Sequence, residues 1–240
     1  MIEKRISLVL LALGVLAGCQ STSAQQSQLQ YDVASMEKVK NYDGLISHYK
    51  SQLEQGSQDP EVKEKLAWAY FQKGDIESAD FYVQHLQKEG VDNPDLYQLE
   101  GQVFDEKNDA NSAVEAYLSS IKTGNKSGQI HVLLGVSYAK LGKYEEAYQE
   151  LNRARLRGYD DVAIKNNIAM IHMANGEYEQ AIETLIPVLK DNPENTVVKA
   201  NLAIALMKAQ QMDAAKKLLK DDFSDQELHS IAVELTQSRS

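Results

Sequence analysis

Apolar residues between positions 130 and 159 recur at helical spacing, and polar residues fill the positions between them. Two small residues in this stretch, Gly135 and Ala147, lie where a pair of antiparallel helices would approach each other closely. Between the two halves, Gly142 can take the left-handed conformation that ends a helix. The larger apolar residues fall on the facing sides of the two helices: Leu134, Tyr138, Tyr144 and Leu151. The stretch therefore predicts a helical hairpin.

This hairpin pattern returns every 34 residues along the chain. The positions equivalent to Gly135 are Ala67, Gly101, Gly135, Ala169 and Ala203. The positions equivalent to Ala147 are Ala79, Ala113, Ala147, Ala181 and Ala215. The turns keep the same spacing, at Gly74, Asn108, Gly142, Gly176 and Gln210. A period this regular indicates stacked copies of one unit, because each hairpin needs its neighbours to bury its apolar face.

A 34-residue period with small and aromatic residues at these positions resembles the tetratricopeptide repeat. The resemblance implies an all-α fold, a tetratricopeptide repeat solenoid in which antiparallel helix pairs wind into a right-handed superhelix. Five repeats are expected in residues 60–223, and residues 31–59 fit a divergent N-terminal repeat. Residues 224–240 fit a C-terminal capping helix and tail, since Ser224 and Glu227 have the spacing of a capping box.

The first 19 residues differ from the rest of the chain. Lys4 and Arg5 precede an apolar run from Ile6 to Val15, which at about ten residues is too short to span a bilayer as a helix. The run ends in Leu-Ala-Gly-Cys, which resembles the lipobox of bacterial lipoproteins. This resemblance implies that residues 1–18 are a cleaved signal peptide and that Cys19, the only cysteine, carries fatty acids such as palmitate.

Residues 19–30 follow as the lipidated cysteine and a flexible Gln/Ser tether, because the segment has almost no apolar content. Gln20 rather than Asp follows the cysteine, so the resemblance implies sorting to the outer membrane, with the lipid-anchored chain facing the periplasm. A formal net charge of -10 disfavours binding to nucleic acid, which needs a basic face. With a single cysteine, the chain can form neither an internal disulfide nor a thiolate metal cluster.

In tetratricopeptide arrays the first helices of the repeats line a concave groove, so the register assigns groove positions. In the first two repeats these positions are largely acidic or polar: Glu61, Glu64, Trp68, Phe71, Asp95, Gln98, Gln102, Asp105 and Glu106. In the last three they are largely apolar: Val132, Val136, Ala139, Asn166, Asn167, Met170, Met173, Val197, Ala200, Asn201, Ile204 and Met207. An apolar strip rimmed by polar residues is typical of a partner-binding site.

Asn167 and Asn201 lie 34 residues apart on this strip. In similar arrays, Asn amides at this register hold a peptide backbone with a paired donor and acceptor, so the two imply a short ladder. The alternative is that the strip is packed internally, by curvature or by the C-terminal helix. Met and Ile at helical spacing commonly belong to a core, and the sequence leaves both interpretations open.

Pro187 falls inside the second helix of the fourth repeat, where it removes the hydrogen bond to the Glu183 carbonyl. We therefore expect the helix to kink or to end early. The sequence at residues 166–188 and 198–206 resembles the TadD-type lipoproteins of tight adherence (Flp) pilus systems. The resemblance implies an outer-membrane scaffold that assists secretin or pilus assembly, with a secretin, a pilotin-like protein or a pilus component as its partner.

Two further functions stay open: an adaptor that recruits or regulates a cell-wall enzyme, and a lipoprotein subunit of another envelope assembly machine. Enzymatic activity is not expected. Residues 47–50 and 122–124 match fragments of penicillin-binding motifs, but they fall in the helical register or its connecting loop, without the strand that such a site needs. No cofactor, metal or small-molecule substrate is expected, and His131 and His172 fall at positions where side chains pack between helices.

Overall fold

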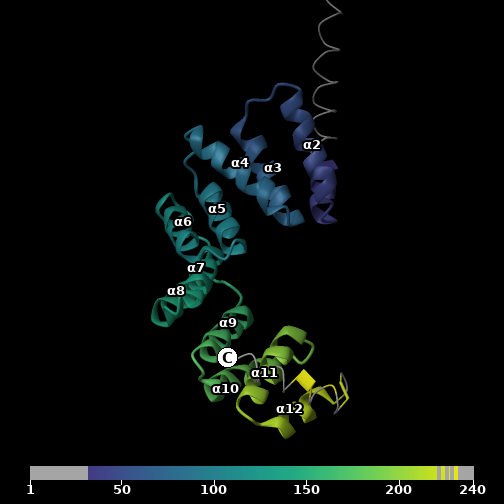
Figure 1. Ribbon diagram of the computed structural model, residues 1–240, viewed down its shortest axis with the longest axis vertical. Helices are drawn as coiled ribbons and strands as arrows, with labels where there is room; N and C mark the ends of the chain where they lie inside the picture. Colours follow the sequence, from purple (N-terminus) through teal and green to yellow (C-terminus); the bar gives the residue numbers. More distant parts are fainter. Residues whose placement is uncertain (1–31, 221–222, 225–226, 228–229, 232–240) are drawn as a thin grey trace, which may run out of the picture. The chain divides into compact units, whose positions relative to one another are not determined.

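The computed structural model describes residues 32–220 together with residues 223, 224, 227, 230 and 231. The regular elements among these residues are α-helices, which follow one another along the chain and are joined by short turns (Figure 1). The contacts divide the chain into two compact units, Met1–Val91 and Asp92–Ser240. The signal peptide, the lipidated Cys19 and the tether that the sequence predicts in residues 1–30 lie outside the described residues.

The first unit begins, in its described part, with a helix at residues 32–38. The helices that follow are α2 (Tyr42–Glu54), α3 (Pro60–Lys73) and α4 (Ile76–Lys88). Each begins after a residue whose side-chain oxygen accepts a hydrogen bond from a backbone N–H of the first turn: Asn41, Asp59 and Asp75. Such caps satisfy donors that have no partner within the helix, which explains where these helices start.

The second unit contains the remaining helices. In order they are α5 (Pro94–Glu106), α6 (Ala110–Lys122), α7 (Gly128–Lys140), α8 (Tyr144–Leu156), α9 (Asp161–Ala174), α10 (Tyr178–Asp191), α11 (Thr196–Lys208) and α12 (Met212–Leu219). Each even-numbered helix packs against the odd-numbered helix before it. In addition α5 contacts α7, α7 contacts α9, and α9 contacts α11, so the odd-numbered helices form one layer.

The small residues of the 34-residue period lie in the core. The eight alanines of the two series are at most 3% exposed. Gly101 marks the tightest approach, because a Cβ atom added there would lie 2.3 Å from Cε1 of the Tyr117 ring in α6. At Gly135 an added Cβ would lie 3.2 Å from the carbonyl oxygen of Ala147 in α8. The small positions therefore set how closely the two helices of a pair can pack.

The turn inside each pair places one residue in the left-handed conformation, always at the same position of the period. The backbone angle φ is positive at Lys40, Gly74, Asn108, Gly142, Gly176 and Gln210. For residues other than glycine this conformation costs about 1–2 kcal/mol. At Lys40 and Gln210 the sequence departs from the repeat but the backbone does not, so the surrounding packing holds both turns in place. Because Lys40 lies 34 residues before Gly74, the 34-residue period extends back into residues 32–54.

Helix α10 runs through Pro187 and ends at Asp191, so the expectation that the proline ends the helix early is wrong. Pro187 is exposed and Glu183 is exposed, so water can bond the carbonyl that the proline leaves without a partner. The turn after the helix does differ from the others. Helix α8 is followed by Gly158 with positive φ, whereas Asn192 after α10 has φ -134°. Its side-chain amide donates to the Val188 carbonyl oxygen at 3.0 Å.

Ser224 and Glu227 have the geometry of a capping box. The Ser224 backbone N–H donates to Oε2 of Glu227 at 2.8 Å, and the Glu227 N–H donates to Oγ of Ser224 at 3.4 Å. Ile231 packs against the buried apolar cluster formed by α9 to α12. Most other residues of the segment predicted as a C-terminal cap, 224–240, lie outside the described part of the chain.

Candidate partner-binding site

The predicted groove residues lie on α7, α9 and α11, within the layer of odd-numbered helices. Met170 and Val197 are 45% and 61% exposed, and Ala200 is exposed as well. Seven further predicted groove residues are half-buried: Val136, Ala139, Asn166, Asn167, Met173, Asn201 and Ile204. Val132 and Met207 are buried in apolar clusters, so the expectation that they line an accessible groove is wrong. The strip is therefore partly open and partly core.

A pocket of about 280 Å³ lies at α7, α8 and α9. Its lining is mainly apolar and contains four predicted groove residues: Val136, Ala139, Asn167 and Met170. The rest of the lining is Lys140, Leu151, Ile171 and Ala174. Such a pocket can take an apolar side chain, and the flexible thioether of Met170 can adjust to its shape. We call it the apolar pocket.

The predicted asparagine ladder takes another form in the structure. Asn201 donates from Nδ2 to Oδ1 of Asn166 at 2.8 Å, which links α9 to α11. Asn167 lines the apolar pocket, whereas Asn201 does not. The amides of Asn167 and Asn201 therefore have different surroundings, and only Asn167 is placed to contact a ligand in that pocket.

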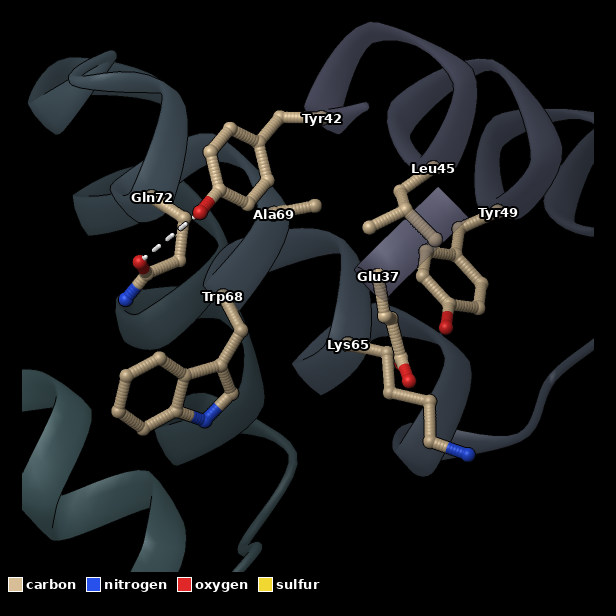
Figure 2. A pocket seen from close by; sticks show the side chains of 8 residues that line it. All are labelled: Glu37, Tyr42, Leu45, Tyr49, Lys65, Trp68, Ala69 and Gln72. Atoms are coloured by element: carbon tan, nitrogen blue, oxygen red, sulfur yellow. Dashed lines mark hydrogen bonds between the residues drawn. The ribbon is translucent and has the colours of Figure 1, made fainter. Parts of the chain in front are cut away.

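A second pocket, of about 300 Å³, lies in the first unit (Figure 2). Its lining comes from the helix at 32–38, from α2 and from α3: Glu37, Tyr42, Leu45, Tyr49, Lys65, Trp68, Ala69 and Gln72. The repeat register places Trp68 in the groove, and four of the lining residues lie in the divergent repeat at residues 31–59, where the sequence pointed to no pocket. We call this the aromatic pocket.

The two pockets occupy the same position of the repeat. A shift of three 34-residue periods takes Lys65, Trp68, Ala69 and Gln72 of α3 onto Asn167, Met170, Ile171 and Ala174 of α9. The same shift takes Glu37 onto Ala139 and Tyr49 onto Leu151. Each pocket is thus built by both helices of one repeat and the first helix of the next. The period carried back through residues 31–59 puts Glu37 and Tyr49 at these positions, but it does not show that they line an open pocket.

Asp105 has a structural role instead of the groove position that the register gave it. Its side chain is 14% exposed. Its Oδ2 accepts hydrogen bonds from the Tyr117 hydroxyl at 2.8 Å and from the Ser137 hydroxyl at 2.9 Å, and its Oδ1 accepts from Lys140 Nζ at 2.8 Å. Burial, reinforced by the charge of Asp105, raises the pKa of Tyr117, which keeps that hydroxyl a donor. Asp105 therefore joins α5 to α6 and α7.

The two histidines noted in the sequence are accounted for by packing. His131 is buried, and its Nδ1 lies 2.7 Å from Oε2 of Glu150. His172 is half-buried, and its hydrogen bond to Glu177 at 2.7 Å holds the pKa of that carboxyl below its usual value. Among the described residues, no group of three or more His, Cys, Asp and Glu side chains could hold a metal ion. No helix in the same residues is long and apolar enough to cross a membrane.

Two family models, both described as tetratricopeptide repeats, match the chain at residues 99–161 and 172–227. Among curated proteins, a TPR repeat-containing protein of Methanocaldococcus jannaschii is 26% identical over 167 residues. That match covers 64% of this chain but only 29% of the archaeal protein, so the chain spans less than a third of this relative.

Solved structures share the fold. A tetratricopeptide repeat protein from Parabacteroides merdae superposes with a TM-score of 0.70 at 10% identity, covering 89% of this chain and 86% of that one. YrrB, described as a TPR protein with an unusual peptide-binding site, superposes with a TM-score of 0.58 at 16% identity, covering 79% and 97%. The all-α repeat fold expected from the 34-residue period is confirmed. Tetratricopeptide repeats therefore build the fold of this chain, and repeats of this kind imply a scaffold for protein–protein interaction.

Proposed function

We propose that this chain is a lipoprotein scaffold of the bacterial envelope that assists secretin or pilus assembly in a tight adherence (Flp) pilus system. Its anchor would be acylated Cys19, and its repeats would face the periplasm from the outer membrane. The observation that carries the proposal is the apolar pocket, an open site with one amide in an otherwise mainly apolar lining. The lipobox-like end of the N-terminal apolar run and the TadD-like sequence at residues 166–206 support the location and the pilus system.

The apolar pocket suits a protein ligand better than a metabolite. Its volume of about 280 Å³ lies at the lower limit of small-molecule sites, which run from roughly 300 to 1,000 Å³. A helix or an extended segment of a partner could insert one apolar side chain there while its backbone lies along the exposed side of α9. The peptide-binding site named for YrrB, which shares the fold, supports the same use of this one.

Met170→Gln tests the role of the apolar pocket. Glutamine has a similar length and helix propensity, and Met170 is 45% exposed, so the helix should remain folded. Losing the burial of one Met side chain costs about 1.5–3 kcal/mol. We therefore expect crosslinking in intact cells to recover about tenfold less secretin or pilus protein with the variant.

Leu156→Gln is the matched control for Met170→Gln. Leu156 is an apolar residue of α8 that is 86% exposed and lies outside the pocket, so its replacement should leave partner recovery unchanged. Equal losses in both variants, or none in Met170→Gln, would contradict the proposal for the pocket. Recovery of a cell-wall hydrolase in place of a secretin or pilus protein would favour the adaptor function instead.

Cys19→Ser tests the anchor separately. Acyl chains contribute about 0.8 kcal/mol per buried methylene, and two or more chains are needed for stable anchoring. Without the thiol no lipid can be attached, so we expect the variant to leave the outer-membrane fraction. Cell fractionation measures this, with thermal unfolding as the check that the repeats remain intact. A variant that still fractionates with the outer membrane would rule out the lipid anchor.

A further inference from the structure

The aromatic pocket has a lining that sets it apart from its counterpart in the second unit. Where the apolar pocket has Ala139 and Met170, the aromatic pocket has Glu37 and Trp68. In Figure 2 the Glu37 carboxylate lies, in this view, between the Trp68 ring and the Tyr49 hydroxyl. The same position of the repeat therefore presents a carboxylate and aromatic rings in one unit and aliphatic groups in the other.

The charges around the aromatic pocket leave a net negative character. Lys65 is the one cationic residue in the lining, and its Nζ is paired with Oε1 of Glu61 at 2.6 Å. The Glu37 carboxylate forms no hydrogen bond or ion pair with any part of the chain that the structure describes. The charge of Glu37 acts on the neighbouring Tyr49. Burial raises the pKa of Tyr49, Lys65 opposes that rise, and the Glu37 carboxylate adds to it.

The aromatic residues complete the chemistry. The faces of aromatic rings carry partial negative charge and attract cations, and Trp does so most strongly. Trp68 is half-buried and packs edge-to-face with Phe71, at 6.0 Å between ring centroids and an interplanar angle of 87°. That contact restrains the indole, so a ligand would meet a ring that is already positioned. Tyr42 and Tyr49 add two further rings from α2.

We propose that the aromatic pocket binds the guanidinium group of an arginine side chain on a protein partner. A guanidinium is planar, stacks on aromatic faces and is more weakly hydrated than an ammonium, so it loses less on leaving water than lysine does. Its N–H groups can donate to the Glu37 carboxylate while the plane lies against Trp68. The volume of about 300 Å³ accommodates one long side chain. This inference goes beyond the pilus role, since it concerns the other unit and a different chemistry.

Trp68 is the only tryptophan in the chain, so its fluorescence reports on this pocket alone. The full chain, kept soluble in a mild non-ionic detergent, is titrated with N-acetyl-Gly-Arg-Gly-amide. Two matched peptides carry lysine or the uncharged isostere citrulline in place of arginine. We expect a saturable change in Trp68 emission with the arginine peptide, about tenfold weaker binding of the citrulline peptide, and intermediate binding of the lysine peptide.

Glu37→Gln is the decisive variant, because it keeps the shape of an exposed side chain and removes only its charge. We expect it to erase the preference for arginine over citrulline. Glu54→Gln makes the same charge change on exposed α2 surface outside the pocket and should keep the preference, with circular dichroism confirming the helices in both. No saturable response to the arginine peptide, equal binding of the citrulline peptide, or equal losses in both variants would overturn the inference. None of these outcomes bears on the apolar pocket, because no pilus protein is present.

Discussion

Replacing Asp105 with alanine is expected to lower the free energy of unfolding of the second unit by about 2–4 kcal/mol. The carboxylate is 14% exposed and accepts from two hydroxyls and one ammonium. Its removal leaves the Tyr117 hydroxyl without its acceptor, which costs about 1–3 kcal/mol, whereas the Ser137 hydroxyl keeps the Leu133 carbonyl oxygen at 3.2 Å. Tyr117 is fully buried, so water cannot readily replace the lost partner. Chemical denaturation followed by circular dichroism measures the change.

Two variants separate the hydrogen-bond network from the charge of Asp105. Asp105→Asn keeps one acceptor oxygen but loses the charge that attracts Lys140. Its free energy of unfolding should therefore lie between those of wild type and Asp105→Ala. Glu106→Ala removes a carboxylate from the next, exposed position and should change stability by less than about 0.5 kcal/mol. An Asp105→Ala variant as stable as Glu106→Ala would show that these hydrogen bonds do not hold the three helices together.

The sequence predicted the helix pairs well, because each pair is defined by local features. The 34-residue spacing of small residues places the contacts inside a pair, and a left-handed residue such as Gly142 ends its first helix. Lys40 went unnoticed because nothing in a lysine side chain favours positive φ. The early end of the helix expected at Pro187 is wrong, because the local rule ignores the buried Leu185 and Val188, which keep α10 packed on both sides of the proline. The kink, the other expected outcome, stays a prediction.

The candidate site was less predictable, because it depends on contacts between repeats. The register placed Val132 and Asp105 on the groove side. Whether a side chain there is buried depends on which residues of the next helix pack against it. The donors to Asp105 lie 12, 32 and 35 residues further along the chain, and no local pattern pairs them with it. The position of the pockets, in contrast, does follow the period. What the sequence could not supply was which groove positions stay open.

The second large effect is expected at Gly101, where Gly101→Ala should destabilise the second unit by about 1–3 kcal/mol. Alanine usually stabilises a helix interior by about 1 kcal/mol relative to glycine. A loss of stability in Gly101→Ala would therefore point to a steric clash and not to helix propensity. The added Cβ would lie 2.3 Å from Cε1 and 2.5 Å from Cδ1 of the Tyr117 ring, which is fully buried and held by its hydrogen bond to Asp105. The ring cannot move aside without breaking that bond, so the helices must separate.

The rest of the repeat supplies the control and the rescue for Gly101→Ala. At Gly135 the nearest atom to an added Cβ would be the Ala147 carbonyl oxygen at 3.2 Å, with Cβ of Glu150 and Cγ of Leu151 at 3.4 Å, so Gly135→Ala should cost much less than Gly101→Ala. The position equivalent to Tyr117 is a leucine in the fourth repeat, where Leu185 accompanies Ala169. Introducing Gly101→Ala into a Tyr117→Leu background recreates that pairing, and its added cost there should fall below about 0.5 kcal/mol. An equal cost in both backgrounds would mean that the ring does not require glycine at position 101, and that the Gly101–Tyr117 contact is not what sets the spacing of α5 and α6.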